Sequence, residues 1–195
     1  LSAVLAGIAP LVSVHHWTYR ELFLQFAGID PFTVLPGELK ARLESGLGIT
    51  PVGLPDDDLD CWLDLMMTHV IEPELGAGLV FVRDYPASQA ALARLRPGTP
   101  PVAARFEAYL IGVELANGFY ELADASEQRA RFENDLERRR DGRQAGVTMD
   151  ERLLSALEYG LPDCAGVALG VERLLMIASG VTCLRDVIAF PFDSA

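Results

Sequence analysis

Apolar side chains recur at a spacing of three to four residues in several segments of the chain, which predicts amphipathic helices. The segments are 17–27, 37–45 and 57–70. In the first of them Leu22, Phe23 and Phe26 share the face that we expect to be buried. Residues 1–14 also predict a buried helix, because this apolar stretch is short and lacks the basic leader of a signal peptide.

Two further helices are predicted from capping signals. Asp124 stands three residues before Glu127, and Thr148 stands three residues before Glu151. Reciprocal hydrogen bonds between side chain and backbone at this spacing mark the N-terminus of a helix. The expected ends of the two helices are Gly142 and Gly160.

Strands are predicted in the middle of the chain. Residues 78–83 form an apolar run that is followed by a turn at Tyr85 and Pro86, and residues 105–122 read as a hairpin that turns at 111–112. Helices and strands do not alternate as they would in a doubly wound sheet. The sequence therefore predicts an α+β fold, an antiparallel sheet flanked by helices.

The expected turn decides which residues of the hairpin lie opposite one another. It pairs Tyr109 with Glu114. It also pairs Glu107 with Ala116, so that Glu107 and Glu114 become diagonal neighbours on one face. Two such carboxylates repel each other unless a cation lies between them, and their hard oxygens suit Mg²⁺ carrying a nucleotide phosphate. The alternative is a half-exposed hairpin with solvated glutamates.

Gly118 interrupts the second strand of the hairpin. A glycine inside a strand often marks a β-bulge, which changes the direction of the side chains around it. We therefore expect a bulge at Gly118 that turns Asn117 and Glu121 toward the same site.

The segment from Gly160 to Met176 predicts a turn, a strand containing glycines, and a helix that opens with Glu172-Arg173. Gly166 and Gly170 have no Cβ and allow another group to approach the backbone closely. Arg173 falls in the first helical turn, beside free N–H groups and the positive end of the helix dipole, where it can hold a phosphate. The alternative is an arginine in a surface ion pair.

Together these motifs resemble those of the class II lysyl-tRNA synthetases, and more closely those of a family of small paralogues that ligate (R)-β-lysine to elongation factor P. In this family the run E-x-A-N-G-F-x-E-L supplies magnesium and amino-acid ligands, and A-G-x-x-x-G-x-[DE]-R is the third class II signature. The resemblance extends from about residue 20 to the C-terminus and includes R-D-V-I-A-F-P at 185–191.

The resemblance implies a role for each matching residue. Glu107 and Glu114 would bind the metal, and Glu114 and Arg173 would act in catalysis. The residues expected at ATP are Glu114, Leu115, Gly170 and Arg173. The residues expected at the amino acid are Asn117, Phe119, Glu121 and Ala168. The implied cofactors are ATP and Mg²⁺.

Three details resemble the β-lysine ligases more than the synthetases. Residues 85–90 contain P-A-S-Q where synthetases usually have P-A-E, and 162–164 read P-D-C where they tend to have P-P-T. Ala168 stands at a position that is usually glycine in the synthetases. One methyl group in a tight pocket discriminates between substrates by roughly 1–3 kcal/mol. Neutral drift is the alternative for Ala168.

The first and second class II signatures have no counterpart in residues 1–195, and the chain begins with Leu1. We therefore expect the C-terminal portion of a single catalytic domain, which would be inactive alone. The resemblance implies a homodimer for the full-length protein, lysine or β-lysine as substrate, and elongation factor P as acceptor. The alternatives are a lysyl-tRNA synthetase fragment and a non-catalytic nucleotide-binding remnant.

Charge and cysteine usage narrow the class of partner and the location. The net charge is −12, with 28 acidic against 16 basic residues, so binding to tRNA is not expected of this segment. No apolar run approaches the ~18 residues of a membrane span. Three widely spaced cysteines, with no C-x-x-C pair, indicate small buried thiols in a reducing cytoplasm.

Overall fold

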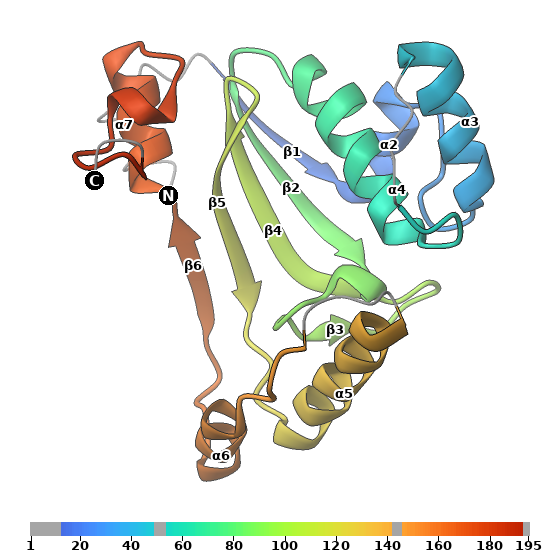
Figure 1. Cartoon of the computed structure of the whole chain (residues 1–195), viewed down its shortest axis with the longest axis vertical. Coiled ribbons are helices and arrows are strands. Elements are labelled where there is room, and N and C mark those ends of the chain that lie inside the picture. The colour runs from blue at the N-terminus through green and yellow to red at the C-terminus, as the bar shows by residue number, and fades with distance from the viewer. Residues whose placement is uncertain (1–12, 49–53, 142–145, 193–195) are drawn as a thin grey trace.

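The chain folds around one curved sheet. The computed structural model describes residues 13–48, 54–141 and 146–192, and within these ranges the sheet has six strands. They are β1 (Val14–Thr18), β2 (Leu79–Pro86), β3 (Leu95–Arg96), β4 (Val102–Leu110), β5 (Val113–Tyr120) and β6 (Ala165–Leu169). Their order is β1-β2-β4-β5-β6, with β3 beside β4 (Figure 1). β1 and β2 run parallel, and the other neighbours run antiparallel.

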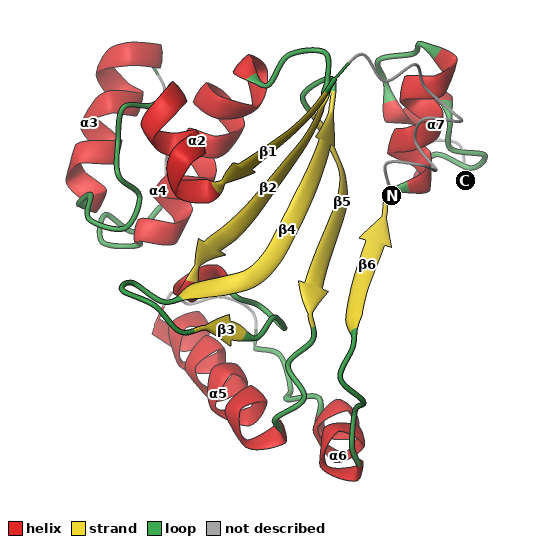
Figure 2. Cartoon of the chain, turned by 180° about the vertical axis from the view of Figure 1, so that it is seen from behind, coloured by secondary structure: helices red, strands yellow, loops and turns green. Residues whose placement is uncertain are grey.

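The helices surround this sheet. They are α2 (Tyr19–Phe26), α3 (Pro36–Leu47), α4 (Leu59–Met66), α5 (Ala125–Asp141), α6 (Glu151–Tyr159) and α7 (Val171–Ser179). α2, α3 and α4 lie together on the side of β1 and β2, and α5 and α6 lie at the end of the sheet away from α7 (Figures 1 and 2). The predicted α+β class, with a mainly antiparallel sheet flanked by helices, is confirmed.

Alternation along the strands divides the core into two layers. On one face Val80 and Tyr109 pack with buried residues of α2 and α4. On the other face Leu79 and Leu110 pack with Leu174 of α7. The strands β4 and β5 therefore contribute to both layers, and this fixes α7 relative to the hairpin.

The predicted helix 17–27 is wrong at its start. Trp17 belongs to β1, which pairs in parallel with β2, and the helix begins only at Tyr19. Thr18 is its N-cap, because its side chain accepts a hydrogen bond from the N–H of Glu21, and the carboxylate of Glu21 accepts one from the N–H of Thr18. The helix predicted over residues 1–14 falls almost wholly on residues 1–12, outside the described residues.

Two other boundaries differ from the predictions, and a third agrees with them. The helix expected over 57–70 is α-helical to Met66 and continues as a π-helix at Met67–Ile71 and a 3₁₀ turn at Glu72–Glu74. The N-cap of α6 is Asp150 rather than Thr148, since its carboxylate accepts the N–H of Leu153 at 3.0 Å. The capping of α5 by Asp124 is confirmed, with a bond of 2.9 Å from the N–H of Glu127.

The strand predicted over 78–83 continues through the residues expected to turn. β2 pairs with β4 as far as Pro86, and an irregularity at Asp84, whose φ is +65°, shifts the register. Tyr85 is consequently buried against β4 instead of lying in a turn. The three cysteines are free thiols, but Cys183 is exposed and Cys61 and Cys164 are only half-buried, so the prediction of buried thiols is wrong.

No helix in the described ranges combines the length and the apolar character that crossing a membrane requires.

Gly118 provides a first test of the packing between β4, β5 and β6. A Cβ at this position would lie 2.4 Å from the ring of Phe106 and 2.9 Å from the backbone oxygen of Gly166. We expect Gly118→Ala to lower the free energy of unfolding by about 2–3 kcal/mol, because the neighbouring backbone cannot move aside. Denaturant unfolding measures the change. Gly37→Ala is the control, since its Cβ would meet no atom of the described residues within 4 Å, and it should not destabilise.

Candidate active site

A β-bulge in β5 sets the direction of the candidate site residues. Tyr109 pairs with Glu114 as predicted, but Ala108 pairs with Ala116, which leaves Leu115 as an extra residue in the strand. Glu107 therefore pairs with Asn117 and not with Ala116. The predicted bulge at Gly118 is also wrong, because this residue pairs regularly with its neighbours on both sides. The expected effect nevertheless occurs: Asn117 shares a face with the two glutamates.

The carboxylate of Glu107 is buried and surrounded by donors. Oε2 accepts hydrogen bonds from the hydroxyls of Tyr85 at 2.6 Å and Tyr109 at 2.5 Å. Oε1 accepts a charged hydrogen bond from Arg105 and a long one of 3.5 Å from Asn117 Nδ2. The exposed fraction of the Glu107 side chain is only 10%. In this structure the Glu107 carboxylate therefore holds the four side chains that donate to it in fixed positions.

The two phenols around Glu107 remain hydrogen-bond donors. Burial raises the pKa of Tyr85 and of Tyr109 well above the ordinary value, and the negative charge of Glu107 raises both further. Both hydroxyls are thus protonated over the whole working range of pH. Arg105 completes the cage, because its guanidinium lies 4.5 Å from the ring centroid of Tyr85 and 5.9 Å from that of Phe119.

Asn117 is left with one unused hydrogen-bonding atom. Its amide nitrogen faces Glu107, which can only accept. Its Oδ1 is consequently turned away from that carboxylate, is buried, and has no donor among the described residues. An unsatisfied buried acceptor costs about 1–3 kcal/mol. A ligand that carries an N–H donor, such as an ammonium group, would satisfy it.

The two motifs predicted to converge do so. Arg173 Nη1 donates to the backbone oxygen of Glu114 at 2.8 Å and to its carboxylate at 3.1 Å, across 59 residues of sequence. Arg173 lies in the first turn of α7, and in the part of the chain that the structure describes no side chain caps the N-terminus of that helix. Gly170 donates its N–H to Leu115 at 2.8 Å, which ties the helix to β5. Free N–H groups of the first turn and the guanidinium together suit a phosphate.

The other predicted residues occupy mixed positions. Ala168 lies opposite Asn117 on β6, and Phe119 lies opposite Gly166. A Cβ on Gly166 would meet the Glu121 carboxylate at 2.4 Å, so this glycine provides the space for it. Leu115 is different. Its side chain is buried with Leu174 on the opposite face, so only its backbone can border the site.

Glu72 is a site residue that the sequence did not reveal. It follows the π-helix, and its backbone oxygen lies close to the hairpin turn, 3.1 Å from where a Cβ on Gly112 would be. Burial raises the pKa of Glu72, and the negative charges of Glu107 and Glu114 raise it further. The three carboxyl groups thus lie close enough to interact, and two of them pair with an arginine, Glu107 with Arg105 and Glu114 with Arg173.

This donor set fits Mg²⁺ that is bound together with phosphates. Among the described residues no three His, Cys, Asp or Glu side chains are arranged to hold a metal ion by themselves. Mg²⁺ usually takes one or two carboxylates and completes its shell with phosphate oxygens and water. Glu107 and Glu114 stay the predicted ligands, and Glu72, which interacts electrostatically with both, could add a further carboxylate.

Arg105 and the segment after β2 were also missed. Arg105 Nη1 donates to the backbone oxygen of Gln89 at 2.8 Å, and Gln89 Nε2 donates to Asp64 at 3.1 Å. The P-A-S-Q segment is in this way joined to the Glu107 cage. The sequence of this segment indicated a family resemblance but not its contact with the site. That contact depends on Arg105, a side chain from β4.

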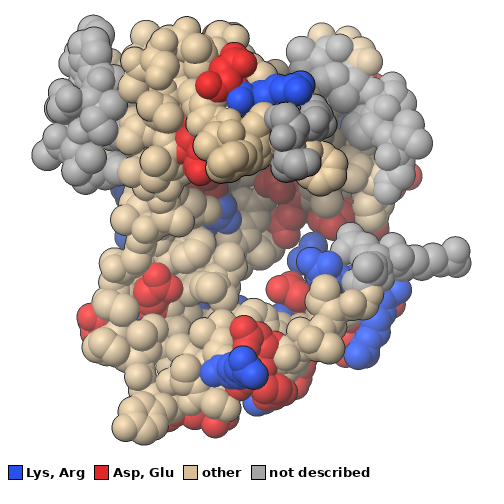
Figure 3. Space-filling view, turned by 60° about the vertical axis from the view of Figure 1, so that its left-hand side comes forward, with Lys and Arg blue, Asp and Glu red and all other residues tan. Residues whose placement is uncertain are grey.

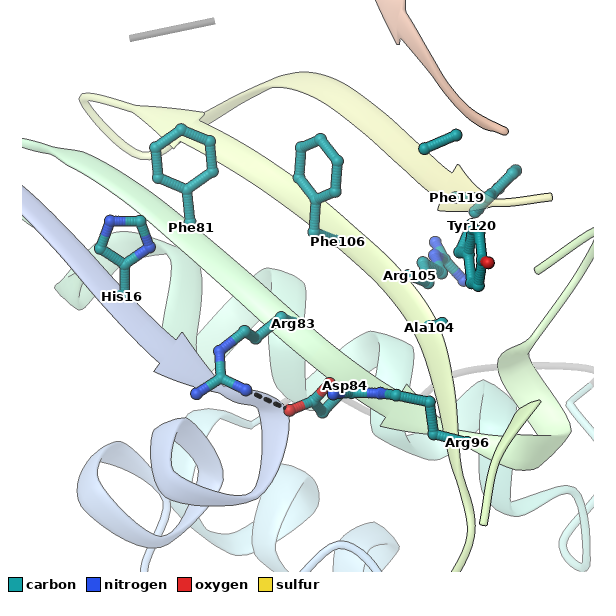
Figure 4. A pocket seen from close by; sticks show the side chains of 11 residues that line it. His16, Phe81, Arg83, Asp84, Arg96, Ala104, Arg105, Phe106, Phe119 and Tyr120 are labelled. Carbon is teal, nitrogen blue, oxygen red and sulfur yellow. Dashed lines mark hydrogen bonds and ion pairs between the residues drawn. The ribbon is translucent and has the colours of Figure 1, made fainter. Parts of the chain in front are cut away.

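A separate hollow of about 480 Å³ is lined mainly by residues of the opposite face of the sheet (Figure 4). His16 stacks on Phe81 there, with ring centroids 5.0 Å apart. Phe106 and Tyr120 extend this aromatic wall. Phe119 and Arg105 border both the hollow and the candidate site, so the two are neighbours, while the glutamates and Asn117 do not line the hollow.

Comparison with known proteins identifies the family of the chain. The family model of the class II tRNA synthetases (D, K and N) matches residues 32–194. Three curated relatives carry the name elongation factor P–(R)-β-lysine ligase. The Vibrio cholerae protein is 43% identical over 100% of this chain and 60% of its own length. The Vibrio parahaemolyticus protein is 46% identical over 91% and 55%, and the Pectobacterium carotovorum protein is 44% identical over 98% and 59%.

The chain thus spans between 55% and 60% of the length of these relatives. The match of the family model covers most of the chain, including the hairpin and α7. The protein therefore belongs to the class II tRNA synthetase family.

Proposed function

We propose that the protein is a ligase that uses ATP to activate (R)-β-lysine, or lysine, and transfers the acyl group to a lysine side chain of elongation factor P. The contact between Arg173 and Glu114 carries this proposal, because it joins the end of the hairpin to the N-terminus of α7 at a place suited to a nucleotide phosphate. The names of the curated relatives support the amino acid and the acceptor.

The chemistry of the site suits a substrate with an ammonium group. Glu121 presents a carboxylate over Gly166, and Asn117 presents a buried oxygen without a donor. Both lie on the face that also carries Glu114. A molecule that reaches from this acidic end to Arg173 needs an amine at one end and a reacting carboxylate at the other. Lysine and β-lysine meet both conditions.

The reaction would occur in two steps. The substrate carboxylate attacks the α-phosphorus of ATP and pyrophosphate leaves, while Arg173 offsets negative charge on the departing phosphates. The ε-amine of the acceptor lysine then attacks the acyl carbon, and AMP leaves. Bound Mg²⁺ would supply charge neutralisation at the phosphates. Glu107 keeps the Asn117 amide oriented through both steps. Neither step needs a nucleophile from the protein.

Transfer to tRNA is the competing outcome. On the face shown in Figure 3, the Lys and Arg side chains of the described residues form small separate groups rather than a continuous basic surface. This distribution agrees with the net charge of −12. Tight binding to nucleic acid depends on many phosphate contacts. The scattered basic side chains on this face therefore favour a protein acceptor over tRNA.

The test uses the protein expressed from its complete coding sequence. Pyrophosphate exchange with (R)-β-lysine and with lysine measures activation, and mass spectrometry of elongation factor P measures transfer. We expect exchange that requires Mg²⁺, and a mass increase of one acyl residue on elongation factor P. Efficient charging of tRNA with no modification of elongation factor P would refute the proposed acceptor, and absence of exchange would refute activation.

A further inference from the structure

The backbone of Glu121 is held from two sides. Its N–H donates to the backbone oxygen of Cys164 at 3.1 Å, and its carbonyl oxygen accepts a hydrogen bond of 2.6 Å from Nε of Arg94. Its side chain lies over Gly166. The position of this carboxylate therefore depends on the segment that contains Arg94 and on the loop that leads into β6.

Arg94 connects these two segments. Its Nη1 pairs with Asp163 at 2.8 Å, and its guanidinium lies 4.4 Å from the ring centroid of Tyr120. The hydroxyl of Tyr120 in turn donates to the carboxylate of Asp163 at 2.6 Å. The planar guanidinium is thus fixed by an acceptor at one end, an aromatic face beneath it, and the Glu121 carbonyl at Nε.

We infer that Arg94 and Asp163 are positioning residues that fix the Glu121 carboxylate for binding of the substrate ammonium group. The inference rests on the proposed function, in which Glu121 binds that group. Arg94 acts through the peptide that follows Glu121 and not through the substrate. Asp163 acts one step further away, because it orients Arg94 and holds the loop whose Cys164 oxygen accepts the Glu121 N–H.

A lysine at position 94 cannot reproduce this arrangement. An ammonium group is a single point of charge, whereas the guanidinium presents donors in a rigid plane and stacks on an aromatic ring. Arg94→Lys should retain the pairing with Asp163 and lose the simultaneous bond to the Glu121 carbonyl. Arg94→Lys therefore separates the pairing with Asp163 from the bond to the Glu121 carbonyl.

The first measurement follows the geometry directly and does not depend on activity. Hydrogen exchange by mass spectrometry is measured on the protein expressed from its complete coding sequence, in peptides that cover 119–123 and 162–166. We expect exchange at the Glu121 amide to be ~10-fold faster in Arg94→Met than in the wild type, since the bond to Cys164 opens more often. Unchanged exchange would overturn the inference, whether or not the protein proves to be a ligase.

The second measurement follows the consequence for substrate binding. In pyrophosphate exchange, Arg94→Met should raise KM for the amino acid ~10-fold, with kcat and KM for ATP within about twofold of the wild type. Asp163→Asn should raise it less, ~3-fold, because the bond from Nε remains. Equal increases in both KM values would show a general disruption of the fold and overturn the positioning role.

Two controls make the result specific. Arg129→Met removes an ion pair with Glu151 of similar geometry, 2.8 and 3.0 Å, between α5 and α6, and it should leave KM unchanged. Arg94→Met added to Glu121→Gln should cause no further rise in KM, because residues that act through one group are not additive. An additive effect would contradict the inference. A wild-type protein without pyrophosphate-exchange activity would refute the proposed function. The hydrogen-exchange result would still decide the positioning role.

Discussion

Replacement of Arg105 with methionine is expected to lower the free energy of unfolding by about 3–4 kcal/mol. The guanidinium is the charged partner of Glu107, and the side chains of the two residues are exposed by only 17% and 10%. Removing one partner leaves a buried charge without compensation, which typically costs 3–5 kcal/mol. The hydroxyls of Tyr85 and Tyr109 would remain as donors, so the loss should not reach the upper limit. Denaturant unfolding with a constant m-value measures it.

A double variant separates the lost charge partner from lost packing. Arg105→Met combined with Glu107→Gln removes both charges, and we expect it to recover at least half of the stability lost in Arg105→Met alone. Arg173→Met is the matched control, because its side chain is 47% exposed. It should change stability by less than about 1 kcal/mol. If Arg105→Met cost no more than this control, the tyrosines alone would suffice to hold Glu107.

Arg173→Met is expected to have the largest effect on the reaction. Removal of a preorganised group that stabilises developing charge usually lowers the rate ~10²–10³-fold. We expect a loss of this size in kcat/KM for pyrophosphate exchange by the protein expressed from its complete coding sequence. The stability should stay close to that of the wild type, so that the loss cannot be attributed to unfolding.

The control for this prediction is Arg152→Met. Arg152 is an exposed arginine of α6, which lies at the other end of the sheet from α7 (Figure 1). It should retain full activity. Arg173→Lys should fall between the two, because it keeps the charge but cannot reproduce both contacts with Glu114. Full activity of Arg173→Met would remove the main support for a phosphate site at this helix.

The meeting of the hairpin and the helix that carries Arg173 could be predicted from the sequence. The strand register of the hairpin could not. The turn at 111–112 and the pairing of Tyr109 with Glu114 follow from local signals, and both are confirmed. The bulge at Leu115 has no such signal, since its neighbours are ordinary strand residues. Gly118 suggested a bulge at the wrong position. The glycine is needed there because a Cβ would collide with the ring of Phe106 and the backbone of β6.

The groups around the site were missed for a different reason. Glu72 and Arg94 reach the site across long separations in sequence. Arg105 lies two residues from Glu107, but it also donates to the backbone of Gln89, 16 residues away, and spacing along the chain gives no indication of that contact. Tyr85 was assigned to a turn because proline follows it. The pairing of β2 with β4 continues past this point, and a tertiary contact therefore prevailed over the local preference.

The bulge in β5 changes the spacing of the side chains that share one face of the strand. A regular strand repeats its side-chain direction every second residue, so groups on one face are separated by whole repeats. Glu114 and Asn117 are three positions apart and still face the same way. The strand thereby offers a side-chain separation that even spacing cannot provide, and under the proposed function this separation would set the distance between the phosphate end and the amine end of the site.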